Sequence, residues 1–244
     1  MEPQLQNWHS FCQYHIGDWH GTWTRYAPTG EAQESFQCIR SFRLSEDGNQ
    51  VHHQNHYTYA DGTQTSKTFE IKTKPITQAL FLDNSFSWGS QAIQSGCQFF
   101  IETGFSHENR RISVVAVYDP QHNLERIVAI SEHLGSFVET DPGGPRINQG
   151  NDRWQGTLRA IKPNWVVSSL SPIPFKALQT MNESYLTLHL RDGISTSLPP
   201  QLAAHTSTGL IVDWLIEPTL LNRGIRYYDA TSFTEFTLTQ FCFA

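Results

Sequence analysis

The sequence predicts an all-β protein of short antiparallel strands, with one short helix near the N-terminus. Three observations support this fold class. Charged residues make up 16% of the 244 residues and aromatic residues 12%, whereas charged residues average about 25% in soluble domains. Solvent-exposed helices need charges on their outer faces, so this composition disfavours helical bundles and coiled coils. Apolar and polar residues also alternate along many short segments, and turn residues separate those segments.

The elements of the first half are assigned from their periodicity. Residues 3–16 are predicted to form the helix, because the bulky residues between Trp8 and His15 fall on one face at helical spacing. Trp19 and Trp23 then alternate with polar residues, as in a half-buried first strand. Turn sequences separate the later segments and favour an antiparallel meander. Further strands are predicted over residues 36–43, 51–59, 66–72, 79–88, 98–105, 111–118 and 125–132.

The second half repeats this pattern after a loop rich in Gly and Pro at residues 140–145. The motif W-x-G-T at residues 19–22 recurs at residues 154–157, which predicts two similar units in tandem. Their expected limits are residues 1–138 and 146–244, and one larger barrel is the alternative. Strands are predicted over residues 156–161, 165–170, 183–190, 210–217, 224–229 and 232–243.

Four segments of the first half carry a family resemblance. They are GDWHGTWTRYAPTG from residue 17, RSF at 40–42, N-x-Y at 55–57 and IETGF at 101–105. Together they resemble a lipocalin-like family of largely uncharacterised cyanobacterial proteins. That resemblance implies two lipocalin or calycin-like antiparallel β-barrels, the second more degenerate. Bilin lyases and phenolic acid decarboxylases share this barrel class, so the implied fold leaves carrier and enzyme both open.

Charge and cysteine content restrict the expected partners. The net charge is −6 and basic residues do not cluster, which disfavours a nucleic-acid surface. No apolar run approaches the length of about 18 residues expected of a membrane span, and the first residues show no secretory pattern. The four cysteines are scattered without CxxC spacing, as expected of reduced thiols. We therefore expect a cytoplasmic protein without metal or cofactor, and we leave a homodimer open.

The densest group of candidate site residues lies in the segment at residues 51–59. On a strand, His53, Asn55, Tyr57 and Tyr59 share one face, which we expect to point inward. Imidazole, amide and phenol groups form a polar, uncharged lining that suits an aromatic or carbonyl-bearing ligand. His53 is the candidate that moves a proton near neutral pH. The other two histidines of the segment are interpreted as solvent-facing rather than as zinc ligands.

Glu102 is the second catalytic candidate, because it lies in an apolar run at residues 99–105. A carboxylate in such surroundings must find a cation or raise its pKa. The expected partner is Arg111 or Arg110, across a short turn. One interpretation is a structural ion pair and the other a catalytic base. A similar pattern at Glu217, followed by two arginines, favours the structural interpretation.

Three further aromatic residues complete the predicted ligand-binding set. Trp23 and Phe100 lie on strands that should line the interior, and Tyr118 ends a strand near a turn, where it would reach a pocket rim. Large aromatic residues of small barrels are also common core residues, and this is the main alternative for Trp23.

Two functions from different classes follow from these residues. The first is a cofactor-independent biosynthetic enzyme, such as a cyclase, isomerase, decarboxylase or condensing enzyme, that acts by acid–base chemistry on a small aromatic or conjugated substrate. Its role in natural-product biosynthesis is implied by the resemblance alone. The alternative is a non-catalytic carrier of a hydrophobic small molecule or pigment. A chromophore lyase would need a reactive, partly exposed cysteine, and none stands out.

Overall fold

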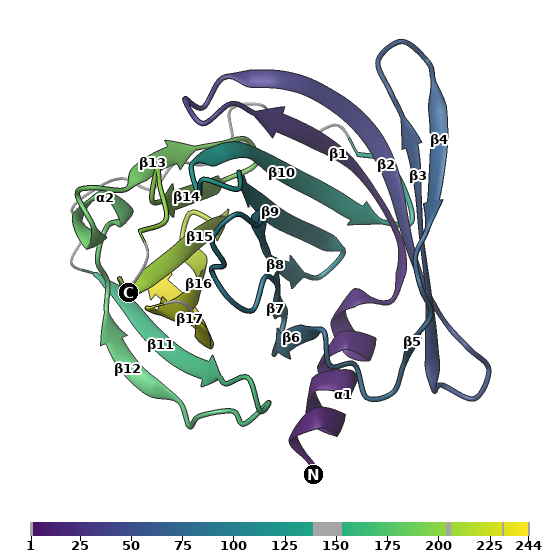
Figure 1. Ribbon diagram of the computed structural model, residues 1–244. Coiled ribbons are helices and arrows are strands. Elements are labelled where there is room, and N and C mark those ends of the chain that lie inside the picture. Colours follow the sequence, from purple (N-terminus) through teal and green to yellow (C-terminus); the bar gives the residue numbers. More distant parts are fainter. Residues whose placement is uncertain (1, 139–152, 204–205, 231, 244) are drawn as a thin grey trace.

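The computed structural model describes residues 2–138, 153–203, 206–230 and 232–243 (Figure 1). The chain forms helix α1 (Pro3–His15), two antiparallel sheets and a four-residue helix α2 (Leu178–Met181). Helix α1 agrees with the predicted segment, and its buried residues include Trp8, Phe11 and His15. Among the described residues, no helix combines the length and the apolar character that crossing a membrane requires.

The first sheet has ten strands and curls into a half-barrel (Figure 1). Its path runs β4-β3-β2-β1-β10-β9-β8-β7-β6, and β5 pairs with β3. The strands are β1 (Gly17–Tyr26), β2 (Ala32–Leu44), β3 (Gln50–Thr58), β4 (Gln64–Thr68), β5 (Lys72–Thr73), β6 (Ala79–Leu82), β7 (Ser85–Gly89), β8 (Phe99–His107), β9 (Arg110–Tyr118) and β10 (Leu124–Leu134).

The prediction of two closed barrels is wrong, because within the described residues neither sheet closes. In the first sheet, helix α1 packs between the two ends of the curl (Figure 1). Its Trp8 and Phe11 share a core with Phe42 on β2 and Phe81 on β6. These aromatic side chains fill the space where the edge strands of a closed barrel would approach and pair. The half-barrel is therefore sealed at this end by a helix.

The second sheet is open and has seven strands in the order β12-β11-β17-β16-β15-β14-β13. This order matches β2-β1-β10-β9-β8-β7-β6 of the first sheet strand for strand. The two W-x-G-T motifs lie at equivalent places, because Trp19 is opposite Leu134 on β10 and Trp154 is opposite Phe243 on β17. The strands are β11 (Trp154–Ile161), β12 (Ser171–Pro174), β13 (Leu186–His189), β14 (Ile194–Leu198), β15 (Thr208–Glu217), β16 (Leu220–Asp229) and β17 (Ser232–Phe243).

Several strand assignments differ from the structure. The segment at 66–72 is divided between β4 and β5, and β12 went unpredicted. The segment at 79–88 is the hairpin β6–β7, which turns at Asp83 with a φ of 50°. The segment at 165–170 makes only a single bridge, between Val167 and Ile161. Strand β14 went unpredicted, because its sequence ISTSL carries apolar residues only at its ends. The predicted loop at 140–145 lies outside the described residues.

The convex side of the half-barrel packs on the second sheet and forms the largest apolar core. Ile112 and Val114 on β9 share this core with Val212 and Trp214 on β15. Side chains alternate along a strand, so the odd-numbered positions of β9 face the opposite, concave side. The alternation thereby divides the first sheet into a face that packs on the second sheet and a concave face with its own residues.

Candidate functional site

Four charged side chains meet on the concave face of the half-barrel, and we call them the charged network. Arg40 on β2 contacts Glu102 on β8, with Nη1 and Oε1 3.1 Å apart. Arg40 Nε lies 3.2 Å from Oε1 of Glu132 on β10, and Arg111 Nη1 on β9 lies 3.0 Å from Oε2 of Glu132. All four residues are at most 5% exposed. The two cations and two anions balance each other in a buried site.

Glu102 is held as an anion by several donors. Ser113 Oγ donates to Oε1 at 2.7 Å, and Trp88 Nε1 donates to Oε2 at 2.6 Å. Burial alone would raise the pKa of Glu102, but Arg40, Arg111 and these two donors outweigh burial and lower it. Every strong contact of Glu102 thus favours its charged form.

The predicted partner of Glu102 is wrong. Glu102 is opposite Val115 on β9, whereas Arg111 is opposite Ser106 four pairs further along. This register places Arg111 against Glu132 and leaves Glu102 to Arg40. Burial lowers the pKa of Arg111 to about 10, which leaves it charged at neutral pH. With 3% of its side chain exposed, Arg111 holds Glu132 in place rather than facing an open surface.

The predicted echo at Glu217 is also wrong. Glu217 is exposed at the end of β15. Its expected partner was Arg223 or Arg226, but Arg223 pairs with Asp213 through two contacts of 2.7 Å and Arg226 Nε donates to Tyr228. When the two sheets are aligned by their W-x-G-T strands, Phe241 and Leu221 stand where the first sheet has Glu132 and Arg111. The charged network therefore has no counterpart at the same positions of the second sheet.

Aromatic side chains border the charged network on two sides. On one side, Trp23, Phe36, Tyr57 and Tyr59 form a connected group that we call the aromatic wall. Ring centroids in this wall lie 5.2–6.4 Å apart. Three of its members are only partly buried, Phe36 being the buried one. The wall therefore offers exposed ring surface on the concave face.

The charged network connects the aromatic wall to a second aromatic pair. Arg40 Cζ lies 4.6 Å from the ring centroid of Trp23. Across the network, Glu102 accepts the hydrogen bond from Trp88, which is 37% exposed and packs edge-on against Phe100 at 5.2 Å. The order along the concave face is thus Trp23, Arg40, Glu102, Trp88.

His53 begins a chain of hydrogen bonds along β3. Its Nε2 lies 2.9 Å from Asn55 Oδ1, and Asn55 Nδ2 donates to Tyr57 Oη at 2.8 Å. Because Asn55 uses its amide to donate, its oxygen accepts and His53 carries the proton on Nε2. The imidazole stacks between Phe42 and Phe69, with centroids 4.3 and 4.0 Å away. Burial and the nearby Arg40 lower the pKa of His53 to about 3, so the ring is neutral at pH 7.

The odd-numbered residues of β3 do face inward, as the alternation predicts, and Asn55 is 2% exposed. Tyr118 is the exception among the predicted site residues. Even-numbered positions of β9 face the second sheet, so Tyr118 is buried there and donates to Pro199 O at 3.0 Å. It cannot line the concave face. The described residues contain no group of three side chains suited to a metal ion.

The residues of the site that went unpredicted include Arg40, Glu132 and Trp88. Arg40 lies in the RSF segment, where its alternation with Phe42 and Cys38 was the available signal. Glu132 also alternates with buried apolar residues on β10. Trp88 carried no signal beyond its position near the end of a predicted strand. What links these residues is pairing between strands distant in sequence, which a single sequence does not reveal.

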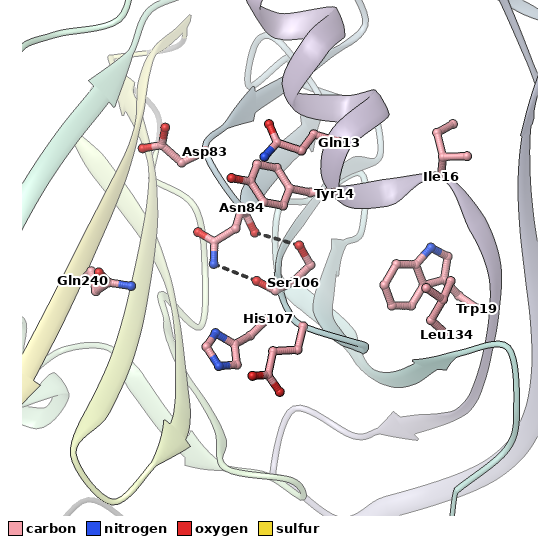
Figure 2. Close-up of a pocket in the computed structure, with 11 residues that line it drawn as sticks. Gln13, Tyr14, Ile16, Trp19, Asp83, Asn84, Ser106, His107, Leu134 and Gln240 are labelled. Atoms are coloured by element: carbon pink, nitrogen blue, oxygen red, sulfur yellow. Dashed lines mark hydrogen bonds between the residues drawn. The ribbon is translucent and has the colours of Figure 1, made fainter.

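A cavity of about 280 Å³ lies where helix α1 meets the β6–β7 turn and the β8–β9 hairpin (Figure 2). Asn84 and Ser106 lie at its centre and bond each other, since Asn84 Nδ2 donates to Ser106 O at 2.7 Å and Ser106 N donates to Asn84 O at 2.7 Å. Asp83 pairs with Arg159. The central polar groups Asn84 and Ser106 are thus occupied by each other, and Asp83 by Arg159.

Comparisons with known proteins place the chain in a family. The family model described as "Domain of unknown function (DUF3598), N-terminal" matches residues 4–137. A solved DUF3598 protein of unknown function from Nostoc punctiforme PCC 73102, a cyanobacterium, is 22% identical with a TM-score of 0.79, over 98% of this chain and 99% of that one. At this identity the likeness supports the fold alone.

Two other comparisons add nothing to the assignment. A Bacteroides fragilis NCTC 9343 protein covers 99% of this chain and 100% of its own, but its TM-score of 0.25 at 9% identity carries no argument. No curated protein matches. Since the family model covers more than half of the sequence, the chain belongs to the DUF3598 family.

Proposed function

We propose that this protein binds a small aromatic or conjugated molecule on the concave face of the half-barrel. The observation that carries the proposal is the position of the Arg40–Glu102 pair between Trp23 and Trp88. Partly exposed aromatic rings on both sides would contact the faces of a planar ligand. The hydroxyl of Tyr57, which is partly exposed, would supply a polar contact that orients it, with the buried Arg40 and Asn55 behind it.

The fold itself does not require these charges. Replacing a buried ion network by well-packed apolar residues is often neutral or stabilising. The second sheet carries Leu221 and Phe241 at positions equivalent to Arg111 and Glu132, within the same strand order. Charges that the architecture can do without are better explained by what they bind. This reasoning favours a ligand with an oxygen or another polar group at the level of Arg40.

Protonation states favour binding over acid–base catalysis. An efficient general base has a pKa near the working pH. The pKa of Glu102 is lowered, and that of His53 falls to about 3. Both groups therefore stay deprotonated at neutral pH and are weak bases. A non-catalytic carrier or sensor of a small molecule is accordingly our main proposal.

A cofactor-independent enzyme is the second candidate, and one observation favours it. The hydrogen-bonded chain from His53 through Asn55 reaches the hydroxyl of Tyr57, which lies in the partly exposed aromatic wall. In this candidate Tyr57 would give a proton to a bound carbonyl or conjugated substrate, as in an isomerisation or cyclisation. Burial raises the pKa of Tyr57, so the phenol carries the proton that this step would transfer.

Binding of Nile red, a neutral conjugated probe with one carbonyl group, tests the main proposal. We expect its fluorescence to rise on binding and its affinity to fall about tenfold in Trp23→Leu and in Tyr57→Phe. His56→Ala, an exposed change on the other face of β3, is the matched control and should bind as the wild type does. Equal affinity in all four proteins would overturn the proposal.

Organic extraction of the purified protein, followed by mass spectrometry, separates the two candidates. A molecule recovered unchanged after long incubation supports the carrier. Conversion of that molecule by the wild type, lost in Tyr57→Phe with unchanged binding, would instead support the enzyme.

A further inference from the structure

A second arginine in the molecule is buried without a carboxylate partner. Arg226 on β16 is 0% exposed. Its Nε donates to Tyr228 Oη at 2.7 Å, while Nη1 and Nη2 reach Ser87 Oγ and Ser90 O only at 3.4 Å. Among the described residues, no Asp or Glu pairs with it. Two weak contacts to neutral oxygens leave much of the guanidinium unsatisfied.

This arrangement is energetically unusual. A buried charge normally has an oppositely charged partner, because leaving it unpaired costs several kcal/mol. Arg223, three residues away on the opposite face of the same strand, follows this rule by binding both oxygens of Asp213. Burial lowers the pKa of Arg226, but an arginine stays protonated in proteins. A negative charge that balances Arg226 is therefore missing from the described part of the chain.

Arg226 forms part of the wall of a cavity of about 470 Å³. The cavity lies between the β6–β7 edge of the first sheet and the face of the second sheet, so both sheets contribute to it. Its volume falls in the range of about 300–1,000 Å³ typical of small-molecule sites. Apolar side chains that include Leu80, Phe100 and Phe233 line much of the rest.

Two further groups of the cavity wall suit an anion. Trp165 also lines the cavity, and its indole Nε1 is buried without a hydrogen-bond partner, so this donor still needs an acceptor. The ring of Phe233 lies 3.7 Å from Arg226 Cζ and fixes the plane of the guanidinium. A carboxylate in the cavity would replace the two 3.4 Å contacts to Ser87 and Ser90 with charge-assisted hydrogen bonds.

We infer that this cavity between the two sheets is a binding site for a small organic monocarboxylate, with Arg226 as its counter-ion. A single cation matches one negative charge rather than the two of a phosphate monoester. The apolar lining matches a hydrocarbon or aromatic body. Trp88 and Phe100 border both this cavity and the concave face. The inference does not depend on the proposed function, because Arg226 takes no part in the charged network.

Calorimetric titration of the full chain with 3-phenylpropanoate and with 3-phenylpropanamide tests the inference, because the two probes differ mainly in charge. We expect the acid to bind about 10- to 100-fold more tightly than the amide. Arg226→Gln should abolish this preference. Arg126→Gln, which removes an exposed arginine, is the matched control and should retain it.

Further measurements keep the inference open to refutation. If Arg226→Gln does not fold, Trp165→Phe keeps the ring, removes the N–H and should weaken acid binding several-fold. The acid, but not the amide, should raise the Tm of the wild type. Trp23→Leu should leave acid binding unchanged, which separates this site from the concave face. Equal binding of acid and amide, no binding of either at millimolar concentration, or an intact preference in Arg226→Gln would overturn the inference.

Discussion

The two sheets share one strand order but carry different residues on their inner faces. In the first sheet, Gly21 on β1 is opposite Glu132 on β10, and in the second, Gly156 on β11 is opposite Phe241 on β17. The same register can be followed from strand to strand across each sheet, and it aligns four positions. For Phe175 it is extended by one residue past the end of β12. Arg40, Glu102, Arg111 and Glu132 of the first sheet correspond to Phe175, Ile211, Leu221 and Phe241 of the second.

This comparison shows that the architecture accepts either solution. Phe175, Leu221 and Phe241 belong to a single apolar cluster of the second sheet. The buried ion pair of that sheet, Asp213–Arg223, lies instead at positions equivalent to Gly104 and Ser113. Charge is thus a local property of each inner face and not a requirement of the strand order. In the first sheet, Arg40 lies against Trp23 of the partly exposed aromatic wall.

The largest expected effect contrasts the two buried arginines of the second sheet. Arg223→Met leaves Asp213 buried without a cation and should lower the free energy of unfolding by about 3–5 kcal/mol. Arg226→Met leaves no anion unpaired, so it should lower the free energy of unfolding by at most about 1 kcal/mol or raise it slightly. Urea denaturation of both variants measures the difference. Similar losses in the two variants would show that Arg226 has a counter-charge in the protein.

A somewhat smaller loss of stability is expected from Arg111→Leu, a single change to the residue type found at the equivalent position of the second sheet, Leu221. Glu132 then keeps Arg40 as a partner, so we expect a loss of about 2–3 kcal/mol. Changing all four network positions together to Phe, Ile, Leu and Phe should recover most of this stability and abolish Nile red binding. If the fourfold variant is less stable than Arg111→Leu, the first sheet needs its charges and the comparison fails.

The smallest effect concerns pH and the first sheet. Burial, Arg111 and Arg40 lower the pKa of His15 well below 6.5. His15 therefore takes up a proton in the unfolded chain at a pH where it stays neutral in the folded protein. Stability falls as the pH drops below about 6.5, and the loss from His15 is about 1 kcal/mol over the first pH unit. His53, with its pKa of about 3, adds to the same direction.

His15→Phe should make this slope shallower, because the contribution of His53 alone remains. The new ring would pack among Phe11, Phe81 and Phe86. The exposed His52→Gln is the control and should leave the slope unchanged. A slope as steep in His15→Phe as in the wild type would assign the proton uptake to groups other than His15.

Local patterns predicted the parts of the fold that depend on one element at a time. Period-two alternation identified the inward face of β3, and helical spacing identified the buried face of α1. The W-x-G-T repeat pointed to the correct alignment of the two sheets. The similar pattern at Glu217 pointed to a wrong alignment of the two sheets, because the spacing of Glu and Arg along the chain does not determine which strands pair.

The remainder depends on contacts between elements distant in sequence. Arg40 and Glu102 are 62 residues apart, and their meeting requires β1, β9 and β10 to lie between β2 and β8. Closure depends on whether β4 and β6 approach each other, which the packing of α1 decides. The prediction for Tyr118 was wrong because the even-numbered side chains of β9 face the second sheet. No local sequence pattern shows which side of β9 that sheet covers.

The shared core has a consequence for how this protein can change. The convex side of the half-barrel is also the apolar covering of the second sheet, so neither repeat carries a complete interior of its own. A chain cut between the two sheets would expose apolar surface on both pieces, and we expect each piece alone to be insoluble. In the intact chain we expect the two sheets to unfold as one cooperative unit. The smallest fragment that we expect to keep its structure therefore contains both sheets.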